Sequence, residues 1–214
     1  MAIAFDAATS AQATAASSIS LSHTASGSDR RAFIGVGNSA ESVATVTGVT
    51  YGGSSCTALW NFTAQTYYHN AGFDFIAPAA SSQTVTATLA NADDELTLGV
   101  ITFTGAHQST APTTATANGS GTAPSVAVAS ASDRMVVDNV YLGNPNATVG
   151  AGQTQRWQQN VSTSTTGAGS TETGSATTTM SWTTTPSDSW TIGAASYFPS
   201  ADVDVLTPQI LLVA

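Results

Sequence analysis

Hydroxyl-bearing and apolar residues alternate with a period of two through much of the chain, and this alternation constrains the fold more than any other feature. In residues 84–89 threonine takes every second position, with valine, alanine and leucine between. Residues 179–183 repeat the pattern around Met180 and Trp182. A period of two directs one set of side chains to solvent and the other to a core, which predicts β-strands.

Segments of similar character, bounded by Gly, Pro, Asn and Asp turn residues, predict further strands along the chain. They lie at residues 18–23, 31–37, 44–51, 56–62, 66–77, 95–104, 124–130, 134–142, 154–160, 188–198 and 204–213. The Ala-rich residues 7–16 carry no apolar stripe, so we expect them to be extended or irregular. The sequence predicts an all-β fold, a single jelly-roll-like antiparallel β-sandwich with long Ser/Thr/Gly-rich loops.

Two stretches of low complexity, residues 109–123 and 162–178, are predicted as long loops of that sandwich. We expect residues 1–17 to form an N-terminal arm or edge strand. Residues 18–203 would form the sandwich, and residues 204–214 an apolar C-terminal strand or partner-binding tail. No strict internal repeat is evident. A loose likeness between segments 81–105 and 125–143 is what hairpins of one sandwich would produce.

Hydroxyl groups, rather than charges, make up the polar surface. The 214 residues include 35 Thr and 27 Ser, only 8% are charged, and there is no lysine. Without lysine, a Walker-type phosphate loop and Schiff-base chemistry are excluded. A net charge of −9 with four dispersed arginines argues against nucleic acid and against anionic membranes as partners. No apolar run reaches the roughly 20 residues that a membrane-spanning helix needs.

The residues with chemical potential form no recognisable catalytic or metal-binding motif. His23, His69 and His107 lack the spacing of a zinc site. Asp93 and Asp94 could bind calcium or serve a glycosidase, but Asp between two strands is already favoured by turn geometry. We therefore expect no cofactor and no catalytic residue. An enzyme would need two carboxylates facing each other across a groove.

Four aromatic or basic side chains and an apolar terminus are the candidates for contact with a ligand or partner. Arg156 and Trp157 lie in the densest polar-aromatic stretch, where the tryptophan could stack on a sugar, anchor an interface or point into the core. Tyr67 and Tyr68 are adjacent aromatic candidates. Residues 204–213 are apolar and include Ile210 and Leu211, so they would complete a sheet or insert into a partner.

Several short motifs together resemble a family of jelly-roll-like β-sandwich proteins found in tailed-bacteriophage virions and in bacterial surface proteins. The resemblance covers residues 18–198 and rests on structural motifs of glycine, proline and aromatic residues. These motifs are SISLSH (18–23), RAFIGV (31–36), VTYGG (49–53), IAP (76–78), TVT (84–86), TFTGAHQ (102–108), GAGQTQRW (150–157) and WTIGA (190–194).

The resemblance implies a non-enzymatic structural protein, foremost a capsid decoration (cement) protein on the outside of an assembled phage capsid. Its partner would be the lattice of the major capsid protein, with copies of the chain forming a homo-oligomer. Synthesis in the host cytoplasm fits the N-terminus, which shows no basic segment followed by an apolar one. The alternative is a carbohydrate-binding tail or fibre module, or a surface adhesin, with a glycan as ligand.

Overall fold

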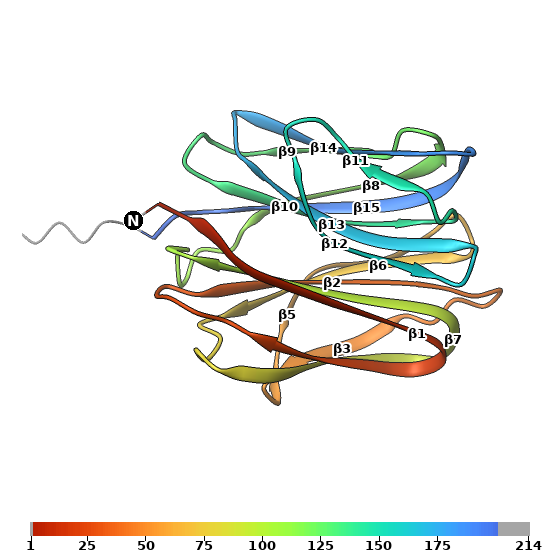
Figure 1. The fold of residues 1–214 in the computed structure, drawn as a ribbon, viewed down its shortest axis with the longest axis horizontal. Coiled ribbons are helices and arrows are strands. Elements are labelled where there is room, and N and C mark those ends of the chain that lie inside the picture. Colours follow the sequence, from red (N-terminus) through yellow and green to blue (C-terminus); the bar gives the residue numbers. More distant parts are fainter. Residues whose placement is uncertain (1, 201–214) are drawn as a thin grey trace, which may run out of the picture.

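The computed structural model describes residues 2–200, which form antiparallel β-sheets throughout (Figure 1). The predicted all-β sandwich is confirmed. The strands of the first half are β1 (Ala4–Thr24), β2 (Arg31–Ser39), β3 (Val46–Tyr51), β4 (Ser54–Ser55), β5 (Thr57–Ala64), β6 (Tyr68–Ile76) and β7 (Ser82–Thr104). Those of the second half are β8 (Thr113–Gly121), β9 (Ser125–Ala129), β10 (Met135–Leu142), β11 (Ala147–Val149), β12 (Thr154–Val161), β13 (Thr165–Thr173), β14 (Thr177–Thr184) and β15 (Asp188–Tyr197).

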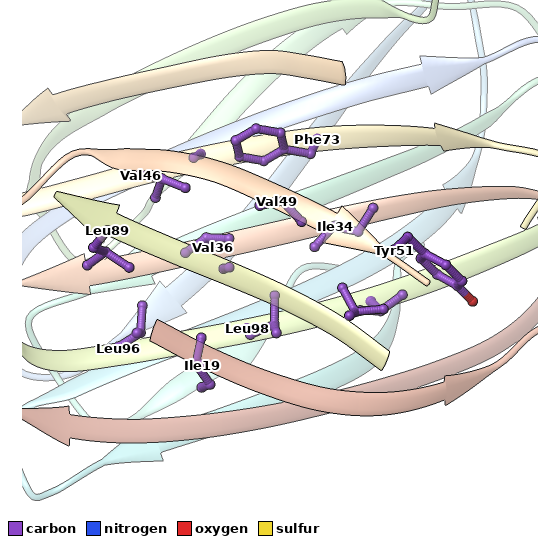
Figure 2. Close-up of a cluster of buried hydrophobic side chains, with 14 of the residues drawn as sticks. Ile19, Ile34, Val36, Val46, Val49, Tyr51, Phe73, Leu89, Leu96 and Leu98 are labelled. Atoms are coloured by element: carbon purple, nitrogen blue, oxygen red, sulfur yellow. The ribbon is translucent and has the colours of Figure 1, made fainter. Parts of the chain in front are cut away.

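The first half is a sheet that folds over on itself, because its two longest strands bend (Figure 1). The first part of β1 pairs with the last part of β7, beside β2, β6 and β5. After a register shift between Ala16 and Ser18, β1 continues along the start of β7, beside β3 and β4. Ala15 has φ 50°, a left-handed conformation that fits a bend. Apolar side chains of the two layers meet in one core, drawn in Figure 2.

The second half has the same two-layer construction. Its larger sheet has the order β12-β13-β10-β15-β8, and a smaller sheet, β11-β14-β9, covers one face of it. Val126 and Val128 of the small sheet pack with Val140 and Ile192 of the large one. The four layers of the molecule therefore stack with the two large sheets in the middle and the two small ones outside (Figure 1).

Strand order and register show that the second half repeats the first. The large sheets read β1-β7-β2-β6-β5 and β8-β15-β10-β13-β12, so each strand has an equivalent. Register aligns LTLG (96–99) of β7 with WTIG (190–193) of β15, and the bulges in β5 and β12 precede Trp60 and Trp157. The expectation of no internal repeat is therefore wrong: the equivalent of segment 81–105 begins near residue 175, not at 125.

Two tryptophans join the halves by reciprocal contacts. A Cβ on Gly193 of the second half would lie 2.2 Å from the ring of Trp60, which belongs to the first half. A Cβ on Gly99 of the first half would lie 2.0 Å from the ring of Trp157, which belongs to the second. Each ring thus occupies a space that only glycine leaves open. Exchange of the same contact in both directions is the mark of a two-fold relation, here within one chain.

Polar residues near this two-fold axis differ between the halves. Asn70 Oδ1 accepts a hydrogen bond from Trp60 Nε1 at 2.8 Å, and Asn70 Nδ2 donates to Asn139 O at 3.0 Å. In the second half Gly167 stands at the position equivalent to Asn70, and Trp157 Nε1 is buried without a hydrogen-bond partner among the described residues. The rings of Trp60 and Trp157 therefore pack in the same way, but only Trp60 has a hydrogen-bond partner within residues 2–200.

Along the two-fold axis, a glycine of one half faces a large side chain of the other half. Gly35 of β2 lies against the side chain of Asn139, its own equivalent in β10. Gly37 lies against the ring of Tyr141, again its equivalent. At both positions one half supplies glycine and the other a large side chain, so the central sheets fit closely.

Two segments predicted as loops are strands, and that part of the prediction is wrong. Residues 109–123 contain β8, which pairs with β15 over its whole length. Residues 162–178 contain β13, a central strand between β10 and β12. Small residues suit β13 because the neighbouring layer approaches closely. For example, a Cβ on Gly167 would lie 2.2 Å from Thr97 Oγ1.

The N-terminal segment, from residue 2, lies within the described residues, whereas the C-terminal tail does not. Residues 7–16 are extended, as expected, because they belong to β1. The boundary expected at residues 17 and 18 falls inside this strand. The tail 204–214 lies outside the described residues. No helix within residues 2–200 is long and apolar enough to cross a membrane.

The outer core of the second half contains a buried carboxylate. Asp138 is fully buried, accepts a hydrogen bond from Trp182 Nε1 at 2.6 Å, and accepts two from the backbone N and Oγ of Ser170. Ile34 and Phe73 of the first half occupy the positions equivalent to Asp138 and Ser170. Burial raises the pKa of Asp138 to about 7, although these three hydrogen bonds lower it.

We expect Gly99→Ala and Gly193→Ala each to destabilise the protein by about 1–3 kcal/mol, because a methyl group there displaces a tryptophan ring. Urea unfolding measures the change. Gly48→Ala is the matched control, since its Cβ meets nothing within 4 Å. An equal loss of unfolding free energy in all three variants would contradict the reciprocal contacts of Trp60 and Trp157 with these glycines.

We expect the stability that protonated Asp138 contributes to be fully present below about pH 3.8 and lost as the pH rises towards about 7. The sign follows because a raised pKa makes the folded state bind the proton more tightly than the unfolded state. Thermal unfolding between pH 4 and 8 should show this decline in the wild type and a flatter profile in Asp138→Asn. Asp133→Asn, at an exposed site, should keep the wild-type profile.

Candidate functional site

A cleft lies where the two-fold relation reaches the end of the central strands. Ser39 at the end of β2 and Gly143 just after β10 occupy equivalent positions, and both line the cleft. The hairpin turns β5–β6 and β12–β13 flank it from the two halves. The cleft has a volume of about 510 Å³, within the range of about 300–1,000 Å³ typical of small-molecule sites.

The two flanking turns share a left-handed residue at one position and differ at the next, where Thr66 has φ 67° and its equivalent Thr163 has no positive φ. Gln65 and Ser162, at equivalent positions, both have φ 55°. The left-handed conformation reverses the chain within a few residues and places the next side chains at the rim. In the first half these side chains are Tyr67 and Tyr68, and in the second half they are Ser164 and Thr165. One wall of the cleft is therefore aromatic and the other carries hydroxyl groups.

Glu95 organises the hydroxyl wall. Its Oε1 accepts hydrogen bonds from the Oγ atoms of Ser162 and Ser164, and its Oε2 accepts one from Ser39 Oγ at 3.0 Å. Burial raises the pKa of Glu95, but its side-chain hydrogen bonds outweigh burial and hold the pKa below its ordinary value. Glu95 is therefore ionised at neutral pH and fixes the hydroxyl groups around it.

The aromatic wall consists of one exposed and one half-buried tyrosine. Tyr67 is 50% exposed, and the only other large apolar side chain exposed in residues 2–200 is Ile76. The ring of Tyr68 packs 6.0 Å from that of Tyr141, centroid to centroid. Burial raises the pKa of Tyr68, with further contributions from Asp188 and Glu95. Tyr68 is thus a fixed support, and Tyr67 presents its ring to solvent.

The other candidates from the sequence lie elsewhere. Trp157 is 5% exposed and belongs to the interior, so its inward alternative holds. The guanidinium of Arg156 lies 3.7 Å above the ring of Phe5 and ties β12 to β1. Ile210 and Leu211 lie outside the described residues. The structure thus brings only Tyr67 and Tyr68 together.

The histidines and the remaining buried carboxylates serve the fold. His69 lies 2.8 Å from Thr63 Oγ1, and burial lowers its pKa to about 4. Asp93 accepts hydrogen bonds from Asn38 Nδ2 and the backbone N of Ala44, which fixes the bend of β7. Within residues 2–200, no group of three or more His, Cys, Asp or Glu side chains comes together as a metal site would require.

Sequence reasoning missed Glu95, Ser162 and Ser164. Glu95 lies 67 residues before Ser162, and the two meet only because the halves pack against each other. The serines belong to a segment whose composition predicts a loop. An alignment of the two halves would have given the signal. It makes Ser162 the equivalent of Gln65, which lies just before Tyr67 and Tyr68 in the chain.

Comparison with known proteins does not place the chain in a family. No family model matches the chain, and neither a curated protein nor a solved structure shows significant similarity to it.

We expect Glu95→Gln to loosen the β12–β13 turn, because an amide offers one acceptor oxygen where the carboxylate offers two. The backbone amides of residues 162–165 should exchange with solvent about tenfold faster. Hydrogen–deuterium exchange measures this. Asp94→Asn, an exposed neighbour, should leave the exchange unchanged. Equal protection in wild type and Glu95→Gln would show that the carboxylate does not hold the turn.

Proposed function

We propose that this chain is a non-enzymatic structural protein of a virion exterior, a capsid decoration protein that binds the assembled lattice of a phage capsid. It would stabilise the particle by mass action, because it binds the assembled lattice and not the free subunits. The resemblance of residues 18–198 to phage β-sandwich proteins motivates this proposal. The repeated four-layer architecture is the observation that carries it.

The two outer sheets are alike in chemistry and lie on opposite sides of the molecule (Figure 1). Their strand segments, residues 18–24, 46–51 and 82–88 in one half and 125–129, 147–149 and 177–184 in the other, contain no Asp, Glu, Lys or Arg. Alternate positions present mainly threonine and serine to solvent. A protein with two like faces suits a bridge between two like neighbours, as a clamp between capsomers requires.

The ionisable groups also support a structural role. Arg31 forms a bidentate ion pair with Asp74 at 2.7 and 2.8 Å and donates to the backbone O atoms of His107 and Thr110. The pair lies buried beneath the connection between the halves, where it fixes the chain rather than a substrate. A net charge of −9 favours the outside of a capsid over its DNA-filled interior.

Quantitative mass spectrometry of purified virions from the source of this chain tests the proposal. We expect a copy number comparable to the number of capsomers. A few copies per particle would assign the chain to the tail or fibre instead, and none would exclude a virion role.

Rebinding of the purified protein to particles that lack it tests the outer faces. Thr86→Lys should weaken binding, because it places a charge in the centre of an uncharged face. Gln12→Lys adds the same charge to an inner-layer strand and should bind like the wild type. Equal binding by both variants would exclude the outer face of the first half as a contact.

A further inference from the structure

We infer that the cleft between the two hairpin turns binds a saccharide that carries no acidic group. This goes beyond the proposed structural role, because it would hold for a capsid, tail or surface protein alike. The inference rests on the different chemistry of the two walls and on the charge of the cleft.

The aromatic wall fits the apolar face of a sugar ring. Tyr67 is 50% exposed at the rim, and aromatic rings that combine an apolar body with a polar tip are suited to such contacts. Tyr68 lines the cleft beside it and packs on Tyr141, so the wall has a rigid base. Little side-chain freedom would be lost at this base on binding.

The opposite wall is rich in hydrogen-bond acceptors. The hydroxyl groups of Ser162 and Ser164 both contact Glu95 Oε1 and lie 2.8 Å from each other, so their protons are engaged within the wall. Towards a ligand the remaining lone pairs of these oxygens can act only as acceptors. The carboxylates of Glu41 and Asp94 line the same cleft. A ligand must therefore bring several donors, and the hydroxyl groups of a sugar ring supply them around a compact apolar face.

The charge of the cleft selects among sugars. Three carboxylates line it, and none of the four arginines does, in a chain without lysine. A uronic acid, a sialic acid or a sugar phosphate would meet uncompensated negative charge at short range. An amino sugar would gain from the same field, so we expect hexosamine oligomers to bind more tightly than neutral ones.

The internal repeat gives independent support. Tyr67 and Ser164 occupy equivalent positions, as do Tyr68 and Thr165, so the two walls could have been identical. They are instead complementary, one aromatic and one polar. A ligand with an apolar face and a polar edge needs that difference, whereas a purely structural end of the sandwich does not.

Calorimetric titration of the full chain with neutral, amino and acidic oligosaccharides tests the inference. We expect binding of the neutral and amino series and none of the acidic one. Tyr67→Ala should weaken binding about tenfold, and Tyr67→Phe should retain it, because the ring and not the hydroxyl makes the contact. Ile76→Ala is the matched control: it removes the other exposed apolar side chain, at the far end of β6, and should bind like the wild type.

Any one of three saccharide results would overturn the inference. These are no binding of any saccharide at millimolar concentration, equal affinity of Tyr67→Ala and wild type, or binding of acidic saccharides as tight as that of neutral ones. Binding of butylammonium without binding of any neutral sugar would also overturn it and assign the cleft to organic cations. Virion copy number is measured separately, so failure here leaves the structural proposal untouched.

Discussion

The close approach of the two large sheets is the constraint on which the rest of the structure depends. Trp60 and Trp157 each reach across to a glycine of the other half, and each also lies over a glycine of its own sheet, Gly72 and Gly169. A methyl group at any of these positions would overlap a ring. The close packing of the two central layers, and the cleft at their end, therefore depend on one reciprocal contact.

The two halves reach the same architecture with different cores. The first half fills its outer core with Ile34, Phe73 and Leu89, whereas the second places a buried carboxylate, a serine and a tryptophan there. Strand order and register are kept because backbone pairing and volume determine them. Side-chain polarity can change because most buried polar atoms find a partner, as the carboxylate of Asp138 does, although Trp157 Nε1 has none among the described residues.

Strands with apolar alternation could be predicted from the sequence, as residues 84–89 and 188–198 illustrate. Residues 109–123 and 162–178 could not, because Ser, Thr and Gly carry no hydrophobic period and their strand structure depends on pairing with β15, β10 and β12. The sequence shows Tyr67 and Tyr68 as adjacent residues, so this aromatic pair could be predicted as a candidate contact. The position of Glu95 beside Ser162 could not, since it depends on how the halves pack.

The glycines opposite large side chains along the two-fold axis have a consequence for the autonomy of each half. Two copies of the first half would face glycine with glycine at positions 35 and 37 and leave a void. Two copies of the second would set Asn139 against Asn139 and Tyr141 against Tyr141 in space that holds only one of each. The two halves are therefore complementary rather than identical along the axis, which disfavours a symmetric dimer of either half alone. Covalent linkage keeps the complementary pair at equal number.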